Sequence, residues 1–150
     1  MIHSIFDLEK ETHNFESSNY TNKPVIVFVY MNGCPHCEMM KPAWNSFKEA
    51  NTISTIDVNH KLLNSLISKD SSIFKPANSF PTIYSNSNLT YEGDRSTNSF
   101  LEFSKIVKQK NLEKQKTKTD DKKDKKPKTD KKDKKPKTDK KDKKPKTDKK

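Results

Sequence analysis

The sequence contains little glycine, cysteine and tryptophan, and it lacks a long apolar run. Its 150 residues include 2 Gly, 2 Cys and 1 Trp, and 29% of them are hydrophobic. The longest unbroken apolar run is the segment 25–31, far shorter than the roughly 20 residues of a membrane-spanning helix, so we expect no transmembrane segment. The first residues also lack the basic start and apolar stretch of a secretory signal. We therefore expect an intracellular, cytoplasmic protein in a reducing compartment.

Apolar side chains are entirely absent from the end of the chain. Residues 114–150 hold 20 of the 31 basic residues and 8 of the 20 acidic residues, and they repeat KKDKKPKTD at 122–130, 131–139 and 140–148. Such a segment cannot offset the ordering entropy of roughly 1–2 kcal/mol per residue. We therefore predict one domain over residues 1–113 and a disordered, low-complexity, Lys-rich tail over residues 114–150.

The charge of this tail indicates two possible roles. Its 20 Lys and 8 Asp differ by +12, which favours weak, nonspecific contact with nucleic acid or an acidic partner. Arginine and aromatic residues do not interrupt the repeat, so any nucleic-acid binding would be phosphate contact alone. The alternative is an extended arm that only keeps the protein soluble.

The first half of the domain shows a pattern of alternating helices and strands. We predict an N-terminal helix over residues 4–16, with Ser4 as its N-cap, and a central buried strand over 25–31. A helix over 35–50 should be kinked by Pro42, and its buried face should carry Met40, Trp44 and Phe47.

The second half continues the pattern. We predict a strand over 52–58, a helix over 60–69 and a hairpin of strands 81–85 and 89–92. The helix 60–69 should turn Leu62, Leu63, Leu66 and Ile67 toward the core. The last helix should begin near Ser96 or Ser99, the latter in a capping box with Glu102, and should bury Phe100, Phe103, Ile106 and Val107. The order β-α-β-α-β-β-α predicts an α/β fold, a mixed sheet with helices on both faces.

The two cysteines, Cys34 and Cys37, form a CxxC motif directly after the central strand. A zinc site needs three or four ligands, and the chain offers no other cysteine and only three scattered histidines outside the motif, so we predict no metal and no cofactor. Redox chemistry fits better, because Cys34 stands where a helix begins and free N–H groups favour its thiolate. Cys37 is then placed to resolve a mixed disulfide formed at Cys34.

The residues between the cysteines should tune the pair. His36 can present positive charge to the Cys34 thiolate, and Pro35 stiffens the turn. We expect a Cys34 pKa below about 8.5 and a reduction potential above roughly −270 mV. Alternatively, His36 is an exposed loop residue without an electronic role.

Three segments carry a resemblance to a known family: YMNGCPHCEMMKPAW, SFPTIYS and YEGDRSTNSFLEF. Over residues 24 to about 110 they resemble thioredoxin-like proteins, with a spacing similar to the catalytic domains of protein disulfide isomerases. The resemblance implies a thioredoxin fold and a disulfide oxidoreductase with Cys34 as nucleophile and Cys37 as resolving cysteine, joined as the disulfide Cys34–Cys37 when oxidised. Its substrates would be protein thiols and disulfides.

The resemblance also assigns residues around the motif. Pro81 would be a cis-proline beside the cysteines, with Phe80 binding the substrate backbone, and Arg95 would approach Cys37 and ease its deprotonation. Taken alone, Phe80-Pro81 could be an ordinary trans bond and Arg95 a solvated residue. Two positions depart from the family pattern: Gly33 replaces an aromatic residue before the first cysteine, and Phe28 replaces a buried acid that assists proton transfer.

Two functions follow as hypotheses. The first is thiol–disulfide exchange through Cys34 and Cys37, with an unidentified reductant or oxidant. The alternative is a non-enzymatic tether, in which the domain binds a partner and the basic tail attaches to nucleic acid or an acidic surface. The run KKDKKPK is also similar to a nuclear-localisation signal, so the nucleus is an alternative location. The Lys, Asn, Ser and Ile content with a tandem repeat is similar to proteins of AT-rich genomes, including giant viruses, and for a viral protein the virion would be a further alternative.

Overall fold

The computed structural model describes residues 5–8, 15–20 and 22–120. Strands β1 (Ile5–Leu8), β2 (Val25–Tyr30), β3 (Ser54–Asn59) and β4 (Thr82–Ser85) form one sheet in the order β1-β3-β2-β4. The helices are η1 (Ser17–Tyr20, 3-10), α1 (Pro35–Ala50), α2 (His60–Lys69) and α3 (Thr97–Asp120). β3 pairs in parallel with β1 and β2, whereas β4 runs antiparallel to β2, so the predicted mixed sheet is confirmed.

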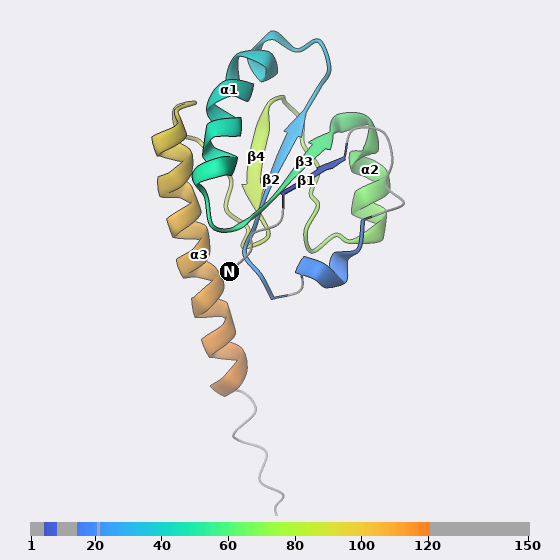
Figure 1. Cartoon of the computed structure of the whole chain (residues 1–150). Helices are drawn as coiled ribbons and strands as arrows, with labels where there is room; N and C mark the ends of the chain where they lie inside the picture. Colours follow the sequence, from blue (N-terminus) through green and yellow to red (C-terminus); the bar gives the residue numbers. More distant parts are fainter. Residues whose placement is uncertain (1–4, 9–14, 21, 121–150) are drawn as a thin grey trace, which may run out of the picture.

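The sheet separates two layers of helices, as predicted. Helices α1 and α3 lie side by side on one face, and α2 covers the other (Figure 1). Because β2 is buried on both faces, its side chains alternate between two apolar clusters. Val25, Val27 and Val29 pack with the α2 side, whereas Ile26, Phe28 and Tyr30 pack with the α1 and α3 side. This accounts for the continuous apolar run in the sequence.

Helices α1 and α2 agree closely with their predicted ranges. Met40, Trp44 and Phe47 of α1 are buried, and the helix contains Pro42 without a break in its assignment. In α2, Leu63 and Leu66 are buried, whereas Leu62 and Ile67 are only partly buried and pack against the same cluster.

The predicted N-terminal helix is wrong where the structure can test it. Residues Ile5–Leu8 form β1, which pairs in register with residues Thr55–Val58 of β3. Ladder hydrogen bonds to a strand distant in sequence override the weak helical spacing of so short a segment. Residues 4 and 9–14 of the predicted helix lie outside the described residues.

The predicted hairpin forms with only one regular strand. Beyond β4, the segment 89–92 contributes a single bridge between Tyr84 and Thr90, with the backbone hydrogen bonds Ser85 N–Leu89 O (2.8 Å) and Tyr91 N–Ile83 O (2.9 Å). The Tyr91 ring packs against those of Phe100 and Phe103 in α3. The segment therefore joins the α3 layer after the bridge, and no second strand continues the pairing.

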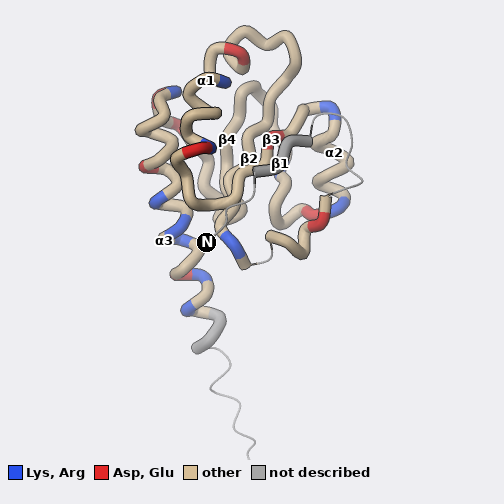
Figure 2. The backbone as a smooth tube through the Cα atoms, in the orientation of Figure 1, with Lys and Arg blue, Asp and Glu red and all other residues tan. Residues whose placement is uncertain are grey.

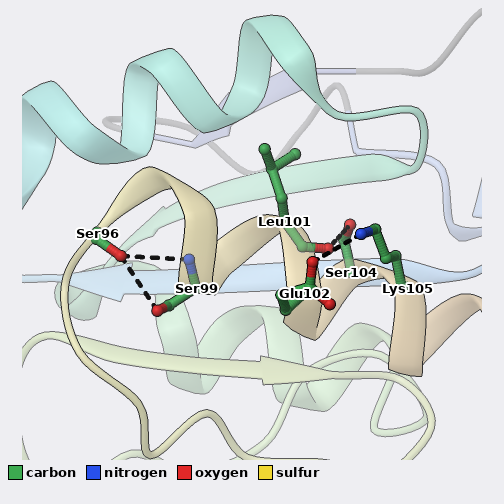
Figure 3. A network of polar contacts seen from close by, with 6 residues as sticks. All are labelled: Ser96, Ser99, Leu101, Glu102, Ser104 and Lys105. Carbon is green, nitrogen blue, oxygen red and sulfur yellow. Dashed lines mark hydrogen bonds and ion pairs between the residues drawn. The ribbon is translucent and has the colours of Figure 1, made fainter.

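Helix α3 begins at Thr97 and is capped by Ser96. The Ser96 hydroxyl accepts a hydrogen bond from the Ser99 N–H at 3.2 Å, as Figure 3 shows, and the Phe100 N–H donates to the Ser96 carbonyl. The predicted capping box of Ser99 and Glu102 is therefore wrong, and Glu102 instead forms an ion pair with Lys105 at 2.6 Å.

The face that α3 turns inward also differs by one residue from the prediction. Phe100, Phe103 and Val107 are buried, but Ile106 is 52% exposed. Positions 100, 103 and 107 follow one helical stripe toward α1, and residue 106 falls beside it. The prediction of a buried Ile106 is thus wrong.

Helix α3 also crosses the predicted domain boundary after Glu113. It continues through Asp120, so the assignment of residues 114–120 to a disordered tail is wrong. Contacts with the domain hold the extension: the Gln115 side chain donates to the Asn22 carbonyl at 2.6 Å, and the Lys114 ammonium donates to the Asn86 carbonyl at 3.4 Å. Residues 121–150, with the three repeats, lie outside the described residues. None of the helices in the described ranges is both long and apolar enough to cross a membrane.

Candidate active site

Cys34 lies at the carboxyl end of the central strand, where the chain turns into α1. Its N–H donates to the Met31 carbonyl at 3.2 Å, and Gly33 adopts φ = +76°, a conformation that glycine accepts readily. Cys34 is the N-cap of α1 and Pro35 is the first helical residue, as predicted. The nucleophile candidate is therefore presented at the positive end of a helix.

The surroundings of Cys34 favour its thiolate. The backbone N–H of Cys37, then the Cys37 side chain, and further the His36 backbone and the Arg95 charge lower the pKa of the Cys34 thiol, against an opposing effect of burial. The neutral thiol makes no capping hydrogen bond of standard geometry with the helix. The backbone N–H groups of the first turn nevertheless lie close enough to stabilise a charged Cys34 sulfur, and the pKa of the thiol is lowered as predicted.

Cys37 is shifted in the opposite direction. Its side chain is fully buried, and this desolvation raises the pKa of the Cys37 thiol, with further increases from the hydrogen bond to Cys34 and from the charges of Cys34 and Glu38. A backbone hydrogen bond from Met31 only partly opposes the increase. Both cysteines are free thiols here, so the predicted Cys34–Cys37 disulfide stays a prediction for the oxidised form. The pair thus contains one sulfur suited to attack and one held protonated.

Pro81 and Phe80 lie beside Cys34, as the sequence resemblance implied. The Phe80-Pro81 bond is cis, and the Cys34 thiol donates to the Phe80 carbonyl with an Sγ–O distance of 3.8 Å. The antiparallel pairing of Val29 with Thr82 brings this loop to the end of β2. A backbone acceptor is thereby available next to the reactive sulfur.

His36 and Arg95 meet at the exposed side of the motif. The Arg95 guanidinium lies 3.4 Å from the His36 Nδ1. Arginine can only donate, so in a hydrogen bond between these groups the His36 Nδ1 would be the acceptor. The resemblance implied that Arg95 approaches Cys37, but the charge of Arg95 acts on Cys34 and is not among the causes that shift Cys37.

A buried carboxylate exists near α1, but on a different strand from the family position. Phe28 fills that position on β2 and packs against Trp44, with ring centroids 5.0 Å apart. Directly opposite Phe28 on β3 stands Asp57, which is 5% exposed. Its two carboxylate oxygens accept from the Trp44 indole N–H (2.7 Å) and the Lys48 ammonium (2.5 Å).

The sequence reasoning missed Asp57. The available signal was Asp57 as the single charged residue of the strand predicted over 52–58, because an acid buried in a sheet needs a partner. Trp44 and Lys48, four residues apart on one face of α1, supply that partner. Asp57 is not among the charges that shift Cys37, whereas Glu38, paired with Lys41 at 2.8 Å, is. In the described ranges, His, Cys, Asp and Glu side chains do not gather in groups of three or more that could hold a metal ion.

The sequence matches the family described as Thioredoxin over residues 5–108, more than half of the chain. The chain belongs to the thioredoxin family, and its fold is the thioredoxin fold. A comparison with curated proteins finds no match.

Solved structures agree with this assignment. The J-Trx1 fragment of ERdj5 is 28% identical, with a TM-score of 0.51, and the match covers 69% of this chain and 51% of that chain. Human ERp44 in its zinc-bound form and in form I is 16% identical, with TM-scores of 0.51 and 0.50. These matches cover 69% and 71% of this chain but only 31% and 30% of ERp44, and at this identity they support the fold alone. The chain thus spans about half the length of the ERdj5 fragment and less than a third of ERp44. The family match, together with the neighbouring thiols of Cys34 and Cys37, supports a thiol–disulfide oxidoreductase.

Proposed function

We propose that this protein exchanges disulfides with protein substrates, with Cys34 as the attacking sulfur and Cys37 as the resolving sulfur. The observation that carries the proposal is the asymmetry of the pair. Cys34 stands at a helix start with a lowered pKa and beside the Phe80 carbonyl, whereas Cys37 is buried with a raised pKa. The Cys34 sulfur is therefore suited to attack as a thiolate, and the Cys37 sulfur stays protonated until the second step.

The reaction would proceed in two exchanges. The Cys34 thiolate attacks one sulfur of a substrate disulfide, the substrate S–S bond breaks, and its other sulfur leaves as a thiolate that takes up a proton. Cys37 then loses its proton and attacks the Cys34 sulfur, so the substrate's second sulfur leaves. The substrate is reduced to a dithiol while Cys34 and Cys37 are oxidised to a disulfide, and the reverse sequence oxidises a substrate.

The surroundings of the pair favour an oxidising protein with a slow second step. A stabilised thiolate stabilises the reduced form, so we expect a potential above the roughly −270 mV of thioredoxin. The second step needs a Cys37 thiolate, which burial disfavours, and Phe28 offers no proton acceptor. Resolution by Cys37 is therefore expected to be slower than attack by Cys34.

The test is insulin reduction by the full chain with dithiothreitol as electron source, comparing the wild type with Cys34→Ser and Cys37→Ser. We expect turnover by the wild type and loss of turnover in both variants. Cys37→Ser should still accumulate a mixed disulfide with insulin, visible by mass spectrometry without reductant, because its Cys34 is intact. An inactive wild type, or a mixed disulfide formed equally by Cys34→Ser, would contradict the proposal.

A further inference from the structure

Arg95 places an unpaired positive charge at the reactive end of the molecule. It is the only arginine in the chain, it is exposed, and it lies in the loop before α3. Its guanidinium contacts the His36 Nδ1 at 3.4 Å, and its charge reaches the Cys34 sulfur. The nucleophile therefore has a cation in its immediate surroundings.

Asp94 in this loop and Glu38 beside the CxxC motif have partners of their own. Asp94 accepts a hydrogen bond from the Ser96 N–H at 2.9 Å, and Glu38 pairs with Lys41 at 2.8 Å. Lys41, Lys48 and Lys105 form ion pairs with Glu38, Asp57 and Glu102, and Arg95 takes part in no ion pair within the part of the chain that the structure describes. The contact with His36 is long, with 3.4 Å between the guanidinium and the ring Nδ1, so a carboxylate would replace it with a stronger, charge-assisted bond.

A substrate can bring such a carboxylate to Arg95. Exchange requires the sulfur of the substrate cysteine at the Cys34 sulfur, and the Cα atoms of consecutive peptide residues are only about 3.8 Å apart. The side chains that flank the substrate cysteine therefore pass over the surroundings of Cys34, where His36 and Arg95 are both exposed. A flanking aspartate or glutamate would meet an attractive charge, and a flanking lysine a repulsive one.

We propose that Arg95 is a specificity-determining residue that selects substrates whose reactive cysteine is flanked by acidic side chains; this inference rests on the proposed function. The ion pair would form at an exposed site, so we expect a rate advantage of about two- to five-fold, the range of exposed pairs. The advantage should largely disappear in about 0.5 M salt, where the Debye length is only about 4 Å.

The experiment uses the full chain carrying Cys37→Ser, so that only the first exchange is measured. Three peptides, each with one cysteine in a disulfide with thionitrobenzoate, carry Glu, Gln or Lys on both sides of that cysteine. Attack by Cys34 on the peptide sulfur releases the coloured thiolate, and its appearance gives the rate. The same series is measured with Arg95→Gln added and, as a matched control, with Lys110→Gln, which removes one exposed positive charge farther along α3.

The decisive quantity is the ratio of the Glu-peptide rate to the Lys-peptide rate. Differences in peptide reactivity and any uniform change in Cys34 reactivity cancel when this ratio is compared between variants. We expect Arg95→Gln to lower the ratio about two- to five-fold and Lys110→Gln to leave it unchanged. Equal ratios in all three proteins would overturn this inference and leave the proposed function intact. Absence of exchange with all three peptides would overturn both.

Discussion

Cys34 and Cys37 are separated by two residues, yet their environments shift their acidities in opposite directions. The N–H groups of the first turn of α1 lower the pKa of the Cys34 thiol, whereas burial in the apolar cluster beside that helix raises the pKa of the Cys37 thiol. The motif and its helix start were predictable from the sequence, because a proline after the first cysteine and a glycine before it set the local backbone. The direction of the Arg95 contact was not predictable, because it depends on a loop 59 residues away from His36.

The lowered pKa of Cys34 gives the first prediction at this scale. In the Cys37→Ser variant, which keeps both the residue-37 N–H and a side-chain donor, iodoacetamide should alkylate Cys34 with a midpoint below the free-thiol value of about 8.5. Because the lowered pKa keeps the Cys34 sulfur ionised at lower pH, the alkylation rate should reach its plateau at a lower pH than that of free cysteine. Arg95→Gln should move the midpoint upward, and Lys110→Gln should not. A midpoint at or above that of free cysteine would show that the helix start does not stabilise the thiolate.

The position of the Asp57 carboxylate opposite Phe28 could not be predicted from either residue alone. The sequence shows that Phe28 cannot transfer a proton, but it does not show which strand neighbour faces Phe28. That pairing arises from the parallel register of β2 and β3, which is a property of two distant segments. The hydrogen bond from Trp44 and the ion pair with Lys48 then account for a buried acid without assigning it to the cysteines.

At the scale of elements, the helices and the central strand were predictable because their signals are local. The spacing of Met40, Trp44 and Phe47 defines the buried face of α1, and the β-branched run defines β2. β1 could not be predicted, because residues Ile5–Leu8 form a strand only by pairing with the edge of β3. The start of α3 was predicted at Ser96 or Ser99 because both residues suit an N-cap; the structure confirms Ser96, since the backbone path of the preceding loop decides between them.

The α3 cap gives a prediction that separates these two assignments. Ser96→Ala removes the acceptor of the Ser99 N–H, so we expect the free energy of unfolding to fall by about 1 kcal/mol. Glu102→Gln would disrupt a capping box at Ser99. With the cap at Ser96, this variant removes only an exposed ion pair with Lys105, so the free energy of unfolding should change by less than about 0.5 kcal/mol. Urea unfolding followed by circular dichroism measures both. A larger loss in Glu102→Gln than in Ser96→Ala would restore the Ser99 assignment.

At the scale of the whole molecule, the sheet is stabilised by cores on both of its faces, and Tyr84 links one of them to the chain after α2. Its hydroxyl accepts from the Lys75 N–H at 2.9 Å and donates to the Lys75 carbonyl at 3.3 Å. Burial raises the pKa of Tyr84 to about 12, against a partly opposing backbone hydrogen bond from Lys75. The native state therefore retains a proton that the unfolded chain loses near pH 10.

This shift predicts loss of stability at alkaline pH. The contribution of Tyr84 is complete below about pH 10 and decreases as the pH rises toward about 12, by roughly 1.4 kcal/mol for each pH unit within that interval. Urea unfolding at about pH 9 and pH 11 should show a smaller decrease for Tyr84→Phe than for the wild type. The variant should also be less stable at pH 9, by about 1–3 kcal/mol, because the Lys75 N–H loses its acceptor. Equal decreases in both proteins would exclude Tyr84 as a source of the alkaline sensitivity.

The path of α3 has a practical consequence for handling the protein. The helix starts near the end of the molecule that carries the start of α1 and runs to the opposite end, where Lys114 and Gln115 fasten it to the domain (Figures 1 and 2). Lysines predominate along its distal turns. An immobilisation handle or a fluorescent label attached where α3 ends, at Asp120, would therefore lie at the end of the molecule away from Cys34 and Cys37, and a sensor chip loaded in this way would present the two cysteines to the analyte.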